Sequence, residues 1–377
     1  MGVWISSKTL ARRHAAYAIQ RTASRIAKAI GTGCVAIVEQ FPWGPQDSVY
    51  LAGSVKDAID TFAPAGMDHL CSGYMALISK GFPDLRVVRV LPASGAVAAS
   101  YTLMVSSTSV ATVTAKYKGS AGNSISLVVS TASDGDANHF NLTASITGAS
   151  GTTSETYQNI NLSGTGADYI PSLANSKLLG SIAKGTAGRP TSGTFSLANG
   201  ATGTVTAADY VGTAGTGNKG IALLEGDKTV RVVCCGDPGN TFRATVNAGL
   251  VAHATLMGDR VAVINGDSGL TAALAITNVA TYSRSERVVY AAPWYYTYDD
   301  VTGAEQLVPP GPLMASLIAQ TSPSTSVAWK DNEQGLKLTA INRLESAYGN
   351  AVADCTDAGI ACFIQEEEGG FRVEAGV

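Results

Sequence analysis

The middle of the chain differs sharply in composition from the segments on either side, and this difference most limits the folds available. From Ala93 to Gly203 the sequence is rich in Ser, Thr, Ala and Gly, and apolar residues alternate with polar ones. Short alternating runs at near-regular spacing, separated by Gly, Asn or Asp, are typical of antiparallel strands. We therefore expect an antiparallel β-sandwich with strands at Tyr101–Val105, Ala111–Tyr117, Ser124–Val129, Asn138–Ile146 and Thr156–Leu162.

From about Asp209 onward, strand and helix signals alternate instead. Alternation at this period predicts parallel strands with helices on the faces of the sheet. The expected helices are Ala207–Thr213, Thr241–Met257 and Thr271–Arg284, and the expected strands are Val230–Cys234, Arg260–Asn265 and Arg287–Ala292.

Residues 31–100 also mix the two signals, so the β-sandwich interrupts a region of α/β character. Ser54 is a suitable N-cap for the first helix of this segment. The expected strands are Val35–Glu39, Val49–Leu51 and Leu85–Leu91, and the expected helices are Ser54–Ala63 and Asp68–Lys80. The predicted fold class is therefore α+β and multidomain, with an inserted antiparallel β-sandwich.

The first 30 residues have the pattern of an arm. Basic residues occur throughout and no acid precedes Glu39. Ala and Ile recur at helical spacing, which predicts a narrow amphipathic helix that docks on another subunit or on its own chain. An organelle transit peptide has a similar pattern, whereas a secretory signal would need an apolar middle. The apolar positions are Ala16, Ile19, Ala23, Ile26, Ala27 and Ile30.

The other end of the chain carries the opposite charge. Glu366, Glu367 and Glu368 form an acidic run between expected strands at Ala361–Gln365 and Phe371–Glu374, and a helix is expected at Gly335–Tyr348. Solvated charge is the usual explanation of such runs, but in a head-to-tail polymer complementary ends would set register and speed association. The candidate inter-subunit residues are Arg12, Arg13, Ile19, Arg21, Arg25, Ile26, Glu366, Glu367, Glu368 and Phe371.

The surface has few charges to keep it solvated. Charged residues make up 15% of the chain, against about 25% in typical soluble domains. Neighbouring subunits would cover such a surface; the alternative is an exported Ser/Thr/Gly-rich β-protein. A net charge of −3 gives no basic field for nucleic acid, and no apolar run is long enough to span a bilayer.

The segment from Val288 to Trp329 combines unusual features. A β-branched strand stops at Pro293, and four aromatic residues follow between Trp294 and Tyr298 before an acidic turn. Three prolines then introduce a short helix at Leu313–Gln320, where missing amide donors cost least.

This order of features resembles the most recognisable block of bacteriophage contractile tail sheath proteins. The resemblance extends over roughly residues 30 to 377, because further segments follow in the order of that family. They are Pro42–Pro45, Arg86–Val90, Lys118–Val128, Asp209–Tyr210, Gly220–Leu224 and Val230–Gly239.

The resemblance implies a non-enzymatic structural subunit of a virion tail, assembled in the bacterial cytoplasm. Such subunits stack as hexameric rings around a tail tube and contract to drive the tube through the host envelope. The implied partners are further copies of the chain and the tube, baseplate and terminator proteins, with no cofactor, metal, nucleic acid or membrane insertion. The α/β domain would be subtilisin-like but non-catalytic, and the N-terminal arm would reach a neighbouring subunit, where family members add a strand.

The resemblance and the composition together predict five regions. They are an arm (1–30), an α+β segment of the sheath core (31–100), the inserted β-sandwich (101–205), the α/β subtilisin-like domain (206–328) and a C-terminal sheath domain (329–377). The last region is shorter than in typical sheath proteins, so either this member is short or the sequence is incomplete.

Two other classes of protein remain open from the sequence. Gly266-Asp267-Ser268-Gly269 resembles the nucleophile turn of serine proteases, with His253 as a base and Asp237 or Asp259 to orient it. The alternative interpretation is a turn that ends a strand. A β-rich tail adhesin, which would be a monomer or closed trimer that binds glycan, also fits the Ser/Thr-rich middle segment.

The remaining motifs predict no chemistry strongly. Gly215–Gly220 fits G-x-G-x-x-G but follows no strand, so a dinucleotide site is not expected. The four histidines and six cysteines lack the spacing of metal ligands. Reduced, buried thiols are the expectation, with a redox pair at Cys234–Cys235 or cross-links between subunits as alternatives.

Overall fold

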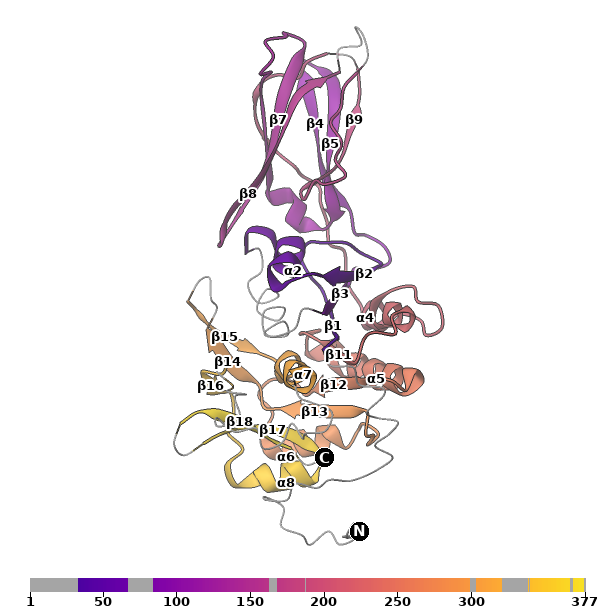
Figure 1. Ribbon diagram of the computed structural model, residues 1–377, viewed down its shortest axis with the longest axis vertical. Coiled ribbons are helices and arrows are strands. Elements are labelled where there is room, and N and C mark those ends of the chain that lie inside the picture. Colours follow the sequence, from indigo (N-terminus) through magenta and orange to yellow (C-terminus); the bar gives the residue numbers. More distant parts are fainter. Residues whose placement is uncertain are drawn as a thin grey trace.

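The computed structural model describes residues 33–66, 84–162, 168–186, 188–298, 303–320, 338, 340–366 and 369–375. The chain forms an elongated molecule in which a β-sandwich stands on an α/β body (Figure 1). The predicted helices in residues 1–30 and at Asp68–Lys80 lie outside the described residues, as does Trp329.

The body is built on an eight-stranded sheet of order β18-β17-β13-β12-β11-β1-β3-β2. The six central strands are parallel, and one antiparallel strand lies at each edge. The β-branched composition of the parallel strands suits burial on both faces. The strands are β1 (Val35–Glu39), β2 (Val49–Ala52), β3 (Leu85–Arg89), β11 (Val232–Cys235), β12 (Val261–Asn265), β13 (Val288–Ala292), β17 (Ile360–Gln365) and β18 (Phe371–Ala375).

Each face of this sheet has its own hydrophobic core. Helices α4, α5, α6 and α8 supply buried residues to one core, and α2 and α7 supply the other. Ser54 caps α2 as predicted, since its hydroxyl accepts a hydrogen bond from the Asp57 amide at 3.1 Å. No described helix is long and apolar enough to cross a membrane. The helices are α2 (Val55–Phe62), α4 (Ala207–Val211), α5 (Asn240–Met257), α6 (Ala272–Val279), α7 (Pro310–Gln320) and α8 (Val352–Asp357).

The β-sandwich has two antiparallel sheets, of order β10-β6-β7-β8 and β4-β5-β9. Burial alternates along β7, as expected for a sheet with one face on a core. All five predicted strands are present, and β9 and β10 are additional. The strands are β4 (Ala98–Val105), β5 (Thr108–Lys118), β6 (Ile125–Thr131), β7 (His139–Gly148), β8 (Gly151–Asn161), β9 (Leu179–Lys184) and β10 (Gly193–Ser196).

The aromatic segment forms a separate three-stranded sheet. Strand β14 (Tyr295–Tyr298) pairs with β15 (Glu305–Val308) on one side and β16 (Arg343–Leu344) on the other. The prediction of a helix at Gly335–Tyr348 is therefore wrong in its described part, residues 338 and 340–348. Backbone pairing of Arg343 and Leu344 with β14 overrides the helical spacing of this segment.

Short 3₁₀ turns join several of these elements. They are η1 (Pro64–Gly66), η2 (Ser120–Ser124), η3 (Gly220–Gly226) and η5 (Gly349–Ala351).

Candidate functional site

The edge strand β18 is the part of the predicted contact surface that the structure describes best. It pairs with β17 and with no other described strand. A strand with one unpaired side offers backbone donors and acceptors to another chain. Among the described strands, β18 is therefore an edge strand of the main sheet.

Two predicted contact residues lie on the β17–β18 hairpin. Glu366 accepts a hydrogen bond from Arg372 at 3.0 Å across the turn. Phe371 is half-buried against the hydrophobic core beneath the sheet. Both side chains therefore have partners within their own subunit. The other candidates, Arg12, Arg13, Ile19, Arg21, Arg25, Ile26, Glu367 and Glu368, lie outside the described residues.

A polar network lies where β11, β12 and β13 end side by side. The buried guanidinium of Arg243, on α5, bonds Asp237 after β11 at 2.7 Å and Asp267 after β12 at 2.8 Å. The same guanidinium carbon lies 4.9 Å from the ring centre of Trp294, which follows β13. Parallel strands bring these residues to one edge, where Arg243 joins three strand ends.

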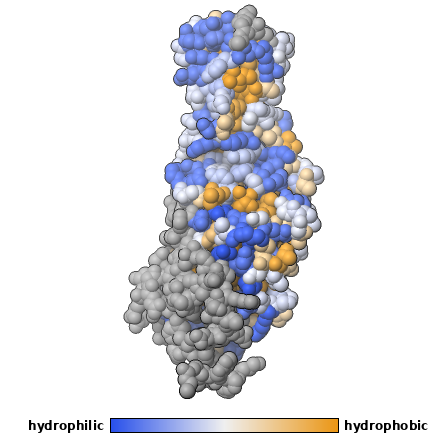
Figure 2. Space-filling view, turned by 45° about the vertical axis from the view of Figure 1, so that its right-hand side comes forward, coloured by the Kyte–Doolittle hydropathy of each residue, from blue (hydrophilic) through white to orange (hydrophobic). Residues whose placement is uncertain are grey.

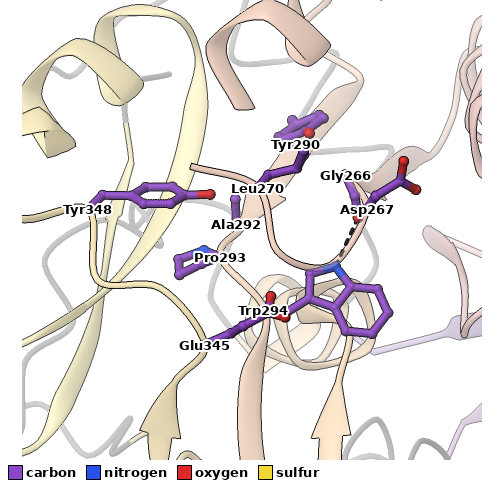
Figure 3. A pocket seen from close by; sticks show the side chains of 9 residues that line it. All are labelled: Gly266, Asp267, Leu270, Tyr290, Ala292, Pro293, Trp294, Glu345 and Tyr348. Atoms are coloured by element: carbon purple, nitrogen blue, oxygen red, sulfur yellow. Dashed lines mark hydrogen bonds between the residues drawn. The ribbon is translucent and has the colours of Figure 1, made fainter. Parts of the chain in front are cut away.

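Trp294 connects the Arg243 network to the loop after β12. Its indole nitrogen donates to the Gly266 carbonyl oxygen at 2.9 Å (Figure 3). Glu345 accepts a hydrogen bond from the Gly269 amide at 2.8 Å. The Glu345 amide in turn donates to the Trp294 carbonyl at 2.9 Å. These bonds attach the segment after α7 to the loop that follows β12.

Glu39, at the end of β1, is buried at 3% exposure. Its carboxylate accepts backbone hydrogen bonds from Gln40 at 2.8 Å and Asp237 at 2.5 Å, and the Tyr210 hydroxyl lies at 3.4 Å. Burial raises the pKa of Glu39 to about 8, although the two backbone donors oppose this shift. Glu39 thus ties β1 to the loop after β11 and titrates near neutral pH.

A small cavity adjoins the network, and it is too small for a substrate. Its volume is about 10 Å³, which corresponds to at most one water molecule. Figure 3 shows mainly apolar and aromatic side chains around it. The lining residues are Gly266, Asp267, Leu270, Tyr290, Ala292, Pro293, Trp294, Glu345 and Tyr348.

The residues considered for a serine hydrolase do not form a triad. His253 lies 3.2 Å from Arg260, which precedes β12, whereas Ser268 follows that strand. Five residues of strand span about 16 Å, so histidine and serine lie near opposite ends of β12. Burial and the positive charge of Arg260 lower the pKa of His253 to about 4. The two aspartates are also engaged, Asp259 with Arg260 and Asp237 with Arg243.

The other motifs do not form sites within the described ranges. No group of three or more His, Cys, Asp or Glu side chains there could hold a metal ion. Burial raises the pKa values of Cys234 and Cys235, which disfavours the reactive thiolates. The loop Gly215–Gly220 follows helix α4 and leads into η3, so it lacks the strand–turn–helix context of a dinucleotide site.

Sequence reasoning missed the residues that organise the strand ends. The sequence pattern places Arg243 on a helix and Glu39 at the end of a strand, but it does not indicate their partners. A charged residue directly after the apolar run Val35–Val38 was the one available signal for Glu39. Nothing in the spacing of Arg243 indicates that it meets two aspartates from other loops.

No protein-family model matches this chain, and no curated protein matches it. Solved structures that share its fold include two sheath tail proteins. The sheath tail protein from Listeria innocua aligns with a TM-score of 0.62 and 17% identity, over 93% of this chain and 70% of that one. The sheath tail protein from Desulfitobacterium hafniense gives 0.60 and 16%, over 99% and 74%. The resemblance noted in the sequence is thus confirmed at the level of the fold.

Proposed function

We propose that this chain is a structural subunit of a phage contractile tail sheath. Copies would polymerise as stacked hexameric rings around a tail tube, and contraction would drive the tube through the host envelope. The observation that carries the proposal is the likeness to two sheath tail proteins over more than nine-tenths of this chain. The subunit would be non-enzymatic and would reside in the virion tail after assembly in the bacterial cytoplasm. Its partners would be the tube, baseplate and terminator proteins.

The outer surface of α5 and α6 supports self-assembly. No exposed side chain on either helix is charged, and Leu256 and Leu274 are 60% and 53% exposed. A surface helix normally carries charged residues on its solvent face, whereas the cores of protein interfaces are depleted in charge. Figure 2 shows apolar patches among polar residues on the side that it draws. A neighbouring subunit would cover the faces of α5 and α6.

The edge strand β18, which among the described strands pairs with β17 alone, supports a link between subunits by strand addition. The basic arm, residues 1–30, would supply a strand or a helix to a neighbouring subunit, and the hairpin that contains Glu366 and Phe371 would lie beside the contact. Contacts of this type join different surfaces on the two partners. They generate open helical polymers when the rotation does not close.

Two finer features belong to the same proposal. The α/β part, residues 206–328, would be a subtilisin-like domain without catalysis, since Ser268 and His253 are held apart. The subunit would consist of five regions, with the limits 1–30, 31–100, 101–205, 206–328 and 329–377. The eight-stranded sheet draws strands from three of these regions.

Negative-stain microscopy of the purified protein tests this function directly. We expect tubes or stacked rings of uniform diameter. A closed trimer that binds glycan would favour an adhesin instead. Isolated particles under all buffer conditions, together with ester or peptide hydrolysis that disappears on Ser268→Ala, would overturn the proposal in favour of a hydrolase.

A further inference from the structure

A buried arginine joins the two parts of the molecule. Arg89, at the end of β3, is 2% exposed and donates to four backbone carbonyls. Three belong to the β1–β2 connection: Phe41 at 2.8 Å, Pro42 at 2.8 Å and Gly44 at 2.9 Å. The fourth is Lys118, the last residue of β5 in the β-sandwich, at 2.8 Å. A single side chain therefore bonds both the α/β body and the β-sandwich.

The guanidinium of Arg89 is bonded to neutral dipoles rather than to an acid. No described carboxylate forms an ion pair or hydrogen bond with it, and burial lowers its pKa to about 10, so it stays charged at neutral pH. A buried charge is costly unless its hydrogen bonds are well made. All four carbonyls must therefore stay in place together, which restricts the movement of Lys118 relative to the β1–β2 connection.

The chain leaves room for this contact at Gly119. A Cβ atom at that position would lie 2.9 Å from the Arg89 guanidinium nitrogen Nη2, and φ is +131°, a conformation that other residues rarely adopt. Gly119 thus allows the end of β5 to approach the arginine closely.

Two further contacts attach the β-sandwich at other points. Trp43, from the β1–β2 connection, is buried in the sandwich core, edge-on to Tyr117 at 5.3 Å. On the other side, the Ser150 amide in the β7–β8 turn donates to the Ala65 carbonyl of η1 at 3.0 Å. Figure 1 shows the β7–β8 hairpin extending down toward the α2 region. Because these contacts lie at different points, they oppose rotation of the β-sandwich relative to the α/β body.

We propose that Arg89 is the positioning residue that fixes the angle between the β-sandwich and the α/β body, so that the two move as one rigid unit. Covalently, only residues 90–97 and 201–206 connect them, and relative motion is the default for domains joined in this way. With Arg89 in place, the sandwich is a fixed projection of the subunit. The proposal concerns the isolated chain and does not depend on the proposed function.

Spin-label distance measurements on unassembled protein test this proposal. Labels at Ser130→Cys in β6 and Thr255→Cys in α5 report on the two parts, because both positions are exposed. Cys71 is replaced by Ser so that it cannot carry a label. The other five cysteines are buried and stay unchanged. We expect a single narrow distance distribution for this parent protein, and a distribution at least twice as wide for Arg89→Met.

Arg260→Met is the matched control. Arg260 is also a buried arginine that donates to carbonyls, those of Leu224 and Asp227 at 2.9 Å, but both lie in the α/β body. This variant should lower the thermal midpoint without widening the distribution. Arg89→Lys, which keeps the charge and three donors, should restore part of the narrow distribution. An Arg89→Met distribution as narrow as that of Arg260→Met would overturn the proposal.

A second variant covers the case in which Arg89→Met does not fold. Gly119→Ala keeps the arginine but places a methyl group against its Nη2 atom. We expect this variant to widen the distance distribution as well, to a smaller extent. A distribution unchanged from the parent protein would contradict the positioning role.

Discussion

At the scale of single residues, Glu39 couples the stability of the sheet to pH. Its pKa is about 8 in the folded chain against 4.5 for a free glutamate. Between these values the folded state binds a proton that the unfolded state does not, so the free energy of unfolding falls as pH rises. The full effect is on the order of a few kcal/mol. We expect Glu39→Gln to remove this part of the pH dependence, measured by urea unfolding from about pH 4.5 to about pH 8.

Glu286, which is exposed, provides the control for that measurement. Glu286→Gln should leave the pH dependence of the wild-type protein unchanged. If Glu39→Gln follows the wild-type pH dependence across the whole range, the raised pKa does not hold.

His253, on α5, changes stability with pH in the opposite direction to Glu39. Its pKa is lowered to about 4 from 6.5, so the unfolded state binds a proton first as pH falls. Its contribution to stability is complete above about pH 6.5 and is lost as pH falls toward 4. We expect His253→Gln, which can still accept from Arg260, to lose less stability than the wild type between these pH values. An identical acid transition in both proteins would argue against a neutral buried histidine.

Sequence could not reveal these residue-scale features. Arg89 and Glu39 belong to β-branched runs that were correctly read as core strands, but a pattern of alternating or continuous apolar residues does not say which charges are buried. Their partners are backbone groups of distant segments, such as Lys118 and Asp237. Such contacts depend on how loops approach one another in three dimensions, and the spacing of residues in the sequence does not indicate them.

At the scale of elements, the uncharged faces of α5 and α6 provide a direct test of assembly. Leu256→Lys and Leu274→Glu place charges on this surface. The new Lys would lie in the last turn of α5 and the new Glu in the first turn of α6. A positive charge at a helix C-terminus and a negative charge at an N-terminus both interact favourably with the helix dipole. We expect the double variant to retain its thermal midpoint within a few degrees and to lose tubes in negative stain.

Leu51 in β2 is the matched control for that double variant. It is 58% exposed but lies at a different surface, at the far edge of the sheet from β18. Leu51→Lys should form tubes as the wild type does. Tubes formed equally by the double variant would show that the α5–α6 face is not a subunit contact.

Most elements with strong local patterns were predicted correctly. The parallel strands, α5 and the long sandwich strands follow from β-branched runs, helical spacing and alternation. The errors fall where tertiary pairing decides the conformation. Arg343 and Leu344 lie in a segment with helical spacing, yet they pair with the aromatic strand β14. Strand β10, with only four residues, is defined by its partner β6 rather than by its own sequence.

At the scale of the whole molecule, we expect the predicted arm to be required for polymerisation but not for folding. By our proposal, residues 1–30 would contact a neighbouring subunit rather than contribute to the fold of their own chain. We expect the truncated protein to unfold within a few degrees of the full chain and to form no tubes. Analytical ultracentrifugation and negative stain measure the two properties. Tubes of normal length without the arm would remove it as a link between subunits.

If the chain polymerises through β18 as proposed, the strand order of the main sheet also determines how early a newly made chain could do so. Val35 of β1 pairs with Val232 of β11, and β18 joins the sheet through β17, which pairs with β13. A chain still emerging from the ribosome can complete its sandwich early, since those strands are close in sequence, but it cannot yet display the β18 edge. Residues 360–375 must therefore be made and folded before a neighbour could attach there as proposed, which would keep shorter nascent chains out of a growing tube.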